Sequence, residues 1–368
     1  MKLHRMGLLA LALLGAALLL GLAVSACGSS SGSSGDGGGG TKYKYVMCVK
    51  DPTAPYQQAF RAGATDEAKK LGVEVQILNG EADSLKIMDI MDNAIVQQAD
   101  GFIMAGATDQ KAIVPGVERL NEAGIPIMAL DTSPGGGKVD YYISFDITGA
   151  SKQAATAFVQ GIKDRNNGEV PKGVVIYIQA PPEDMFTQAC NDGALPVIQE
   201  YPQLQIARYD GEWNNETTNQ RVTDAMTRYG DQVVGIYVIT PDIMATGAVE
   251  AVKSAGKDPK DYGICGICIG PEGLALLQDG SALAIAEQPA YASAVLAVDY
   301  LTKMNNGEET PQIGDTVTEE GAIWSPAQVV ESPWADGAYM ILASPLVPTD
   351  VPVDDPRLWE NQLSYLWQ

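Results

Sequence analysis

Histidine and basic side chains are scarce in this chain of 368 residues. The one histidine is His4, and 24 Lys and Arg stand against 46 Asp and Glu, which gives a formal net charge of −22. A protein with this excess of acidic residues lacks the basic surface that neutralises phosphates, which argues against nucleic-acid binding. A chain without His4 would have no Ser-His or Cys-His nucleophile and no imidazole to offer a metal.

Aromatic residues make up 7% of the chain, and 19% of the residues are charged. Hydrophobic residues still account for 46%, an ordinary globular mixture that rules out wholesale disorder. At roughly 100–200 residues per domain, the length favours two domains over one.

The N-terminus has the pattern of an export signal. Lys2 and Arg5 precede an apolar run from Gly7 to Val24, followed by small residues, as in a secretory signal peptide. The run is also long enough to remain as a membrane anchor. However, Val24-Ser25-Ala26-Cys27 resembles the lipobox of bacterial lipoproteins, which implies that residues 1–26 are removed and that Cys27 is lipidated. Loss of the Lys2 and Arg5 charges would take the net charge from −22 to −24.

Residues 28–40 contain only Gly and Ser apart from Asp36. This composition cannot bury enough apolar surface to order itself. Together with Cys27 it predicts a tether that spans about 20 Å, so we expect a folded body held at an extracytoplasmic membrane surface by its lipid anchor.

From Tyr43 onward, short apolar runs recur and alternate with stretches of helical periodicity. The runs are continuous rather than alternating, which is typical of parallel strands buried on both faces. Alternation of strand and helix predicts an α/β fold, here as two doubly wound parallel-sheet lobes. We expect the chain to cross between lobes near Asp146, Glu287 and Ile323. The predicted parts are residues 41–146 plus 288–322 (N-terminal lobe), 147–287 plus 323–345 (C-terminal lobe) and 346–368 (surface tail).

Ligands of open α/β sheets bind beyond the carboxyl ends of the strands. The residues that follow the predicted strands are carboxylates, an amine and aromatics, a set that suits a small polyhydroxylated ligand. Asp131 and Asp242 could alternatively be helix N-caps. The candidate ligand-binding residues are Lys50, Tyr56, Asp131, Thr132, Asp184, Asn191, Trp213, Pro241, Asp242, Cys268 and Glu287.

Four segments resemble the sugar-binding lipoproteins of ABC importers in the ribose-binding-protein superfamily. They are APYQQAFRAGATDEAKKLG, IPIMALDTS, PDIMATGAVEAVKSAGK and GICIGPEGLALLQDG, within a resemblance from Tyr43 to at least Asn306. It implies the type I periplasmic binding protein fold, with no enzymatic activity and no cofactor.

The resemblance also implies roles for single residues. Tyr56 and Trp213 match aromatics that stack on the sugar from the two lobes, and Asp131 matches the acid that holds its hydroxyls. Trp213 could instead be a core residue. The sequence departs from the family pattern at several positions, which argues against a standard ribose or galactose site: Thr132, Cys190 and Asn191, Pro241, and Cys268.

A neighbouring branch, the receptors for rhamnose and autoinducer-2, has a similar lysine at Lys50, a similar Pro-Asp at Pro241 and Asp242, and an acid at Glu287. For the rest of that branch's binding loop, the nearest acid in this sequence is Asp184. Lys50 could alternatively pair locally with Asp51.

The leading hypothesis is therefore a monomeric lipoprotein that captures a sugar-like ligand and delivers it to an ABC permease, with no metal. One alternative is a receptor that reports ligand occupancy to a signalling partner. Another is a hydrolase with paired carboxylates such as Asp131 and Glu287. Cys265 and Cys268 form a C-x-x-C pattern, but on a strand these side chains point to opposite faces, so a redox pair is not expected.

Overall fold

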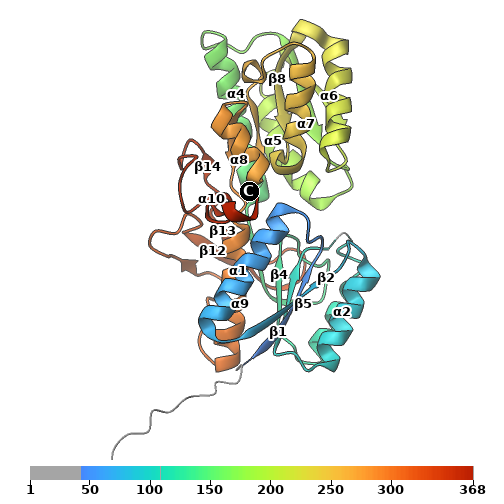
Figure 1. Cartoon of the computed structure of the whole chain (residues 1–368), viewed down its shortest axis with the longest axis vertical. Coiled ribbons are helices and arrows are strands. Elements are labelled where there is room, and N and C mark those ends of the chain that lie inside the picture. Colours follow the sequence, from blue (N-terminus) through green and yellow to red (C-terminus); the bar gives the residue numbers. More distant parts are fainter. Residues whose placement is uncertain (1–42, 108, 368) are drawn as a thin grey trace, which may run out of the picture. The chain divides into compact units, whose positions relative to one another are not determined.

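The computed structural model describes residues 43–107 and 109–367. The predicted signal peptide, Cys27 and the Gly/Ser tether lie outside the described residues. Within them, strands and helices alternate from the first strand onward, and they form two separate sheets (Figure 1).

The first sheet has eight strands, of which six are parallel. All residues of β3 and β4 are buried, as expected of central strands with both faces covered. Two late strands complete one edge in antiparallel order. In spatial order the strands are β2(Glu74–Asn79), β1(Lys44–Val49), β3(Gly101–Ala105), β4(Ile127–Leu130), β5(Lys138–Phe145), β13(Asp336–Leu342), β12(Ala327–Glu331) and β11(Thr316–Val317).

Two pairs of helices cover this sheet. The long helices α1(Pro55–Leu71) and α9(Ala290–Asn306) pack side by side (Figure 1), although they lie far apart in sequence. A Cβ atom at Gly63 of α1 would sit 2.3 Å from the carbonyl oxygen of Tyr291, so glycine permits their close approach. The other pair is α2(Ser84–Val96) and α3(Val114–Glu122).

The second sheet has six strands, and every residue of β6, an interior strand next to the edge strand β7, is buried. Its helices α4(Ile147–Arg165) and α5(Met185–Gln199) pack together, as do α6(Asn215–Tyr229), α7(Pro241–Ser254) and α8(Gly270–Asp279). Two parallel sheets with packed helices confirm the predicted fold class. In spatial order the strands are β7(Leu204–Asp210), β6(Gly173–Gln179), β8(Val233–Val238), β9(Ile264–Ile267), β10(Ala282–Ala286) and the antiparallel β14(Leu346–Val347).

One predicted lobe assignment needs correction. Residues 323–345 were expected in the C-terminal lobe, but β12 and β13 belong to the first sheet, where β13 pairs in parallel with β5. The chain then enters the second sheet at β14, so its third crossing lies at residues 343–345 rather than near Ile323. The physical reason is that β5 would otherwise leave an open edge, which β13 covers.

The C-terminal segment, residues 348–367, also differs from the expected surface tail. Leu358 is fully buried in the core of the second lobe, whereas its neighbour Trp359, in the short helix α10(Trp359–Gln362), is buried in the core of the first. The Trp359 indole donates a hydrogen bond to the carbonyl of Gln288 at 2.8 Å. The tail is thus anchored in both lobes.

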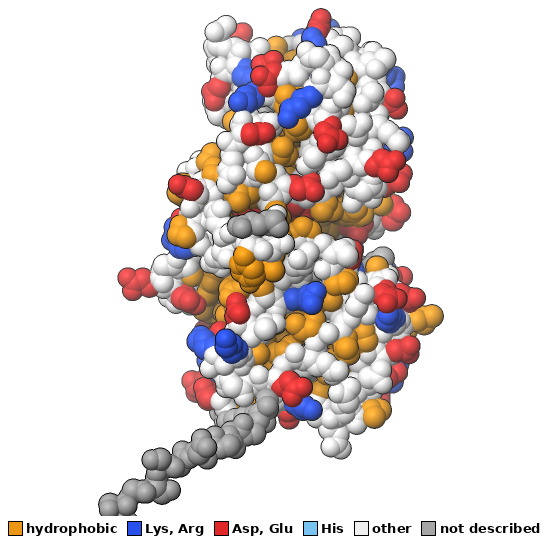
Figure 2. Space-filling model, in the orientation of Figure 1, with side chains coloured by type: hydrophobic (Ala, Val, Ile, Leu, Met, Phe, Trp, Pro, Cys, Tyr) orange, Lys and Arg blue, Asp and Glu red, His pale blue; other side chains and the backbone are white. Residues whose placement is uncertain are grey.

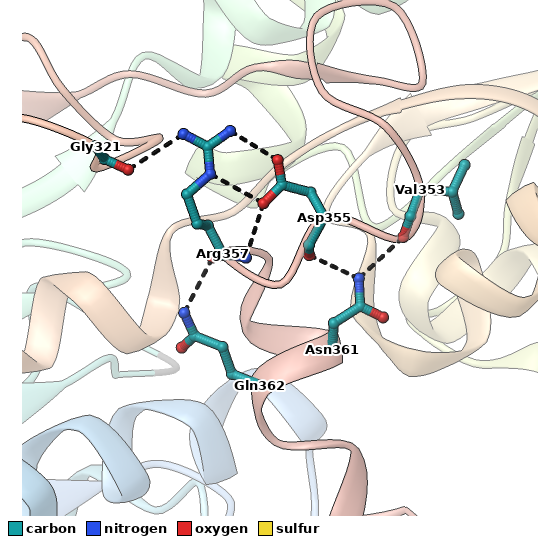
Figure 3. Close-up of polar contacts among 6 residues, drawn as sticks. All are labelled: Gly321, Val353, Asp355, Arg357, Asn361 and Gln362. Carbon is teal, nitrogen blue, oxygen red and sulfur yellow. Dashed lines mark hydrogen bonds and ion pairs between the residues drawn. The ribbon is translucent and has the colours of Figure 1, made fainter.

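An ion pair organises this tail (Figure 3). The Arg357 guanidinium donates to both carboxylate oxygens of Asp355, at 2.9 and 2.7 Å, and to the carbonyl of Gly321 at 3.2 Å. The Asn361 amide donates to the carbonyls of Val353 and Asp355, each at 2.9 Å. The bond to Gly321 ties the tail to the loop that precedes β12, and the others hold the tail's own turn together.

Acidic side chains are scattered over the face shown in Figure 2 rather than gathered in one patch. In the part of the chain that the structure describes, no helix is both long and apolar enough to cross a membrane.

Candidate functional site

Lys50, Tyr56 and Asp131 lie together at the carboxyl ends of β1 and β4. The Lys50 ammonium is 3.8 Å from a carboxylate oxygen of Asp131 and 6.0 Å from the centre of the Tyr56 ring. Asp51, the alternative partner of Lys50, accepts hydrogen bonds from Thr53 instead. The first lobe therefore contributes an opposite-charge pair beside an aromatic ring.

Burial and charge together shift the titration of these groups. Burial raises the pKa of the Asp131 carboxyl, which Lys50 lowers and Asp184 raises further. Burial also raises the pKa of Tyr56 to about 12. For Lys50, burial acts to lower the pKa, but Tyr56 and Asp131 outweigh it, so the pKa lies above its usual value. Lys50 therefore remains charged at neutral pH.

The backbone holds Asp131 in a left-handed conformation with φ of 65°. The Tyr142 hydroxyl donates to the Asp131 carbonyl at 2.7 Å, and a Cβ atom at Gly106 would lie only 2.7 Å from the Asp131 carboxylate. The neighbouring Thr132 hydroxyl accepts from the Ala107 amide at 3.2 Å. No regular helix follows Asp131 directly, so its carboxylate is not a helix cap.

In the second lobe, Asp184 and Asn191 lie on α5. Asp184 caps this helix and accepts from the Thr187 amide at 3.0 Å, yet its charge still acts on Lys50 and Asp131. Asn191 accepts from the Tyr177 hydroxyl at 2.9 Å and donates to the side chain of Gln179 at 3.4 Å. Asn191 is thus held in an internal network.

Trp213 precedes helix α6 and has a left-handed backbone with φ of 56°. Its half-buried ring packs against the core of the second lobe and against Phe186, with ring centres 6.0 Å apart and planes at 66°. The two predicted stacking residues, Tyr56 and Trp213, therefore belong to different lobes.

Asp242 lies in the first turn of α7, after Pro241 at the first helical position. The N-cap is Thr240, which corrects the alternative of Asp242 as the cap. The Asp242 side chain is buried, and its Oδ1 has no hydrogen-bond partner among the described residues. Burial raises its pKa to about 8, with further contributions from Glu272 and Asp131.

Cys268 follows β9, has a left-handed backbone with φ of 65°, and accepts from the Asp242 amide through its carbonyl at 3.2 Å. Burial, then the nearby Asp242, raises the pKa of its thiol well above the usual value. A neutral thiol is therefore present where the family pattern has an acid.

Glu287 directly follows β10, and its charge acts on the Cys268 thiol. Its side chain is 1% exposed, faces the carboxyl of Glu360, and lines a cavity of about 380 Å³ beside α9. The residues lining the cavity beside Asp131 do not include it. The carboxylate pair that the hydrolase hypothesis requires, Asp131 and Glu287, is thus divided between two cavities.

The cavity beside Asp131 has a volume of about 130 Å³ and is lined by both lobes. Asp131 and Thr132 line it from the first lobe, and Phe186 from the second. The Asp131 charge also contributes to the raised pKa of Asp242. Of the predicted binding residues, only Asp131 and Thr132 line this cavity.

A family model described as "Periplasmic binding protein domain" matches residues 45–309. The chain belongs to this family. Its curated relatives include the ribose import binding protein RbsB of Bacillus subtilis (27% identical over 237 residues, 64% of this chain and 73% of the relative). Another is the D-allose-binding periplasmic protein of Escherichia coli (25% identical over 260 residues, 67% of this chain and 80% of the relative).

Solved structures of this family share the fold. A galactofuranose binding protein superposes with a TM-score of 0.69 at 17% identity, covering 87% of this chain and 99% of the other. A solute binding protein from Actinobacillus succinogenes with bound D-allose superposes with a TM-score of 0.66 at 23% identity, covering 73% and 94%.

The periplasmic-binding-protein site contains residues that sequence reasoning missed. Gln57 is fully buried, accepts from the Lys50 amide at 3.0 Å and donates to the Ala105 carbonyl at 2.9 Å. The position of this glutamine directly after Tyr56, a predicted site residue, could have marked it as a site candidate. Phe186, two residues after Asp184, was another. Trp334 and Tyr339, by contrast, reach the cavity on the hairpin of β12 and β13, which no local pattern linked to the site.

The four cysteines of the described residues, Cys48, Cys190, Cys265 and Cys268, are buried and unpaired. Among residues 43–107 and 109–367, no group of three or more acidic, His or Cys side chains could hold a metal ion.

Proposed function

We propose that this protein is an extracytoplasmic solute-binding lipoprotein that captures a sugar or sugar-like polar ligand between its lobes and delivers it to an ABC importer permease. The observation that supports the proposal is the ion pair of Lys50 and Asp131 in one lobe, with Asp184 of the other lobe near enough for its charge to act on both. Asp242 of the second lobe, whose pKa the Asp131 charge helps to raise, adds a buried acid. Carboxylates accept paired hydrogen bonds from adjacent ligand hydroxyls, and a lysine ammonium donates hydrogen bonds to ligand hydroxyls.

The unpartnered Oδ1 of Asp242 supports this role. A buried polar atom without a partner costs free energy, and a ligand hydroxyl that donates to it would remove that cost. Tyr56 from the first lobe and Trp213 from the second would cover the apolar faces of a sugar ring. Thr132, Asn191, Pro241 and Cys268 complete the proposed binding set.

Relatives support the ligand class and the partner. Those named above are described as binding proteins for ribose, D-allose and galactofuranose, and the protein named for ribose is described as an import binding protein. An importer of this kind receives its solute from the binding protein, so a permease is the proposed partner. The protein would act as a monomer and would return its ligand chemically unchanged.

The proposed location follows from the N-terminal sequence. Residues 1–26 would direct export, lipidation of Cys27 would anchor the chain in the cell membrane, and residues 28–40 would tether the folded body. Two acyl chains are needed for stable anchoring, which a diacylated cysteine provides.

A thermal-shift screen of the folded body, residues 41–368, tests the function. Pentoses, hexoses, deoxysugars, polyols and autoinducer-2 are each added in excess, and a ligand at 100 times its dissociation constant adds roughly 2.7 kcal/mol of apparent stability. We expect at least one sugar-like compound to raise the melting temperature and to be recovered intact. No shift with any of these compounds, or recovery of a bound compound in chemically altered form, would contradict the proposal.

A further inference from the structure

We propose that the C-terminal tail, residues 348–367, is a proton-dependent latch that holds the two lobes in one relative arrangement, and that the carboxyl pair of Glu287 and Glu360 closes it. The latch is a conformational device outside the ligand cavity, so it goes beyond the proposed function. The tail also lies outside residues 45–309, the part of the chain that matches the family model. The latch therefore depends on a part of the chain beyond that match.

Three consecutive residues attach the tail to both lobes. Leu358 packs in the core of the second lobe, and Trp359 packs in the core of the first. Glu360 accepts a hydrogen bond at 3.0 Å from the amide of Gly270, the first residue of α8 in the second lobe, and α10 lies beside α8 (Figure 1). The lobes cannot separate at this point while all three contacts persist.

The tail also contacts the segments in which the chain crosses between the lobes. One crossing runs from β10 to α9 through Glu287 and Gln288, and the Trp359 indole donates to the Gln288 carbonyl at 2.8 Å. The Glu287 amide donates at 2.9 Å to the carbonyl of Pro345, in the last crossing. Hinges are short segments of this kind, so a contact between the tail and Glu287 acts on the hinge itself.

The contact between Glu287 and Glu360 is a pair of buried carboxyl groups. The Oε2 atom of each has no hydrogen-bond partner among the described residues. Two ionised carboxylates in this position would repel each other and would both lack water. A proton between them removes one charge, and the N-terminus of α8 favours the charge that remains on Glu360. The contact is therefore stable with a proton and fails when both groups are ionised.

The groups around the pair oppose its ionisation. Asp242 of α7 acts on Glu360, and Glu272 of α8 acts on Asp242 in turn. The Cys268 thiol lies near enough to sense the charge of Glu287. The other titratable or charged residues that line the 380 Å³ cavity with Glu287 are Tyr291, Glu319, Glu320 and Arg357.

Of these, Arg357 is the cation, and Asp355 holds it through two hydrogen bonds. Burial raises the pKa of Glu360 to about 8, and burial together with Glu360 holds the pKa of Glu287 well above its usual value. The pair thus keeps a proton at neutral pH and loses its last proton in the alkaline range.

The latched arrangement is the one in which the facing acids of the two lobes are close. Asp184 of the second lobe acts electrostatically on Lys50 and Asp131 of the first. If the proposed function holds, the latch favours the arrangement that binds ligand, and the apparent dissociation constant falls as the fraction of molecules in that arrangement rises. The latch itself can be tested without ligand.

Hydrogen exchange of the ligand-free folded body, residues 41–368, at pH 6.5 and 9.5 tests the inference. After correction for intrinsic exchange rates, we expect the tail to exchange roughly tenfold faster or more at pH 9.5, while β6 in the core stays protected. Small-angle scattering should show a larger radius of gyration at pH 9.5. Equal protection of the tail at both pH values, or loss of protection in β6 together with the tail, would overturn the latch.

Variants then assign the effect to the carboxyl pair. Glu360→Gln and Glu287→Gln each place an amide in the contact, which donates a hydrogen bond without titrating, so the tail should stay protected at pH 9.5. Glu360→Ala should release the tail at both pH values. Glu331→Gln, at an exposed position on β12, should behave like the unmodified protein. A pH effect that persists in both glutamine variants would refute the pair as the latch and leave the sugar-binding function standing.

Discussion

Glu287 at the end of β10 and Glu360 of the C-terminal tail bury their carboxyl groups against each other. Each side chain is 1% exposed, and the Oε2 atom of each lacks a donor among the described residues. The other oxygen of Glu360 accepts from the Gly270 amide at 3.0 Å. A single proton shared between the two carboxyl groups gives each of them a hydrogen-bond partner. The contact between the tail and the crossing near Glu287 therefore requires that the pair carry a proton.

The pair makes stability depend on pH. Burial raises the pKa of Glu360 from 4.5 to about 8, and burial and Glu360 raise that of Glu287 well above its usual value. The folded state therefore holds protons that the unfolded chain releases. The free energy of unfolding should fall as pH rises from about 4.5 through about 8. Urea unfolding of the ligand-free protein at pH 5.5 and 8.5 measures this.

Glu360→Gln should flatten that pH dependence, because the amide can accept from Gly270 and donate to Glu287 without titrating. We expect the stability difference between pH 5.5 and 8.5 to shrink by about 1–3 kcal/mol. Glu320→Gln, at an exposed position, serves as the control and should leave the pH dependence as it is. An unaltered profile in Glu360→Gln would remove the pair as its source.

Lys50→Met should weaken ligand binding by tenfold or more, about 1.4 kcal/mol, because it removes the cation beside Asp131. It should also lower the stability of the empty protein by about 1–3 kcal/mol, since a buried carboxyl loses its partner. Titration and an unliganded melt on the same variant measure both. Lys138→Met removes an exposed lysine and should change neither. Full affinity in Lys50→Met would exclude Lys50 from the site.

Trp213→Ala should cost at least tenfold in affinity, about 1.4 kcal/mol, with little change in the melting temperature of the ligand-free protein. The reason is that the ring covers the ligand only when the two lobes close on it. If Trp213 were a core residue instead, truncating it would destabilise the ligand-free protein by roughly 3–5 kcal/mol. Preserved affinity with a large drop in melting temperature would assign Trp213 to the core.

Cys27→Ser should release the protein from the membrane fraction or leave it unprocessed, because a serine cannot carry the thioether-linked lipid. Fractionation of cells and mass determination of the mature N-terminus measure this. Ser25→Ala, two residues before the modified position, is a matched control that should keep attachment. Wash-resistant attachment of a processed Cys27→Ser protein would contradict the lipoprotein assignment.

The sequence predicted the parallel strands because they are continuous apolar runs, such as GVVIYIQ in β6. The residues after those strands supplied Lys50 and Asp131 as separate site candidates, and the structure shows that they pair. It did not predict the hairpin of β12 and β13. In β12 buried and exposed residues alternate in part, and β13 pairs with a strand far away in the chain. Glu287 was a candidate because it follows a predicted strand and matches an acid of the neighbouring branch. Its burial against Glu360 was not predicted, because Glu360 lies in a segment with no repeating pattern.

The pairing of β13 with β5 also constrains the order in which the protein can fold. A chain synthesised from its N-terminus exposes the edge of β5 until residues 336–342 have emerged, after strands β6 to β10 of the second sheet. Contacts between such distant residues form slowly, and an open strand edge invites pairing with other chains. A fragment that ends before Asp336 should therefore aggregate even though it contains most of both lobes.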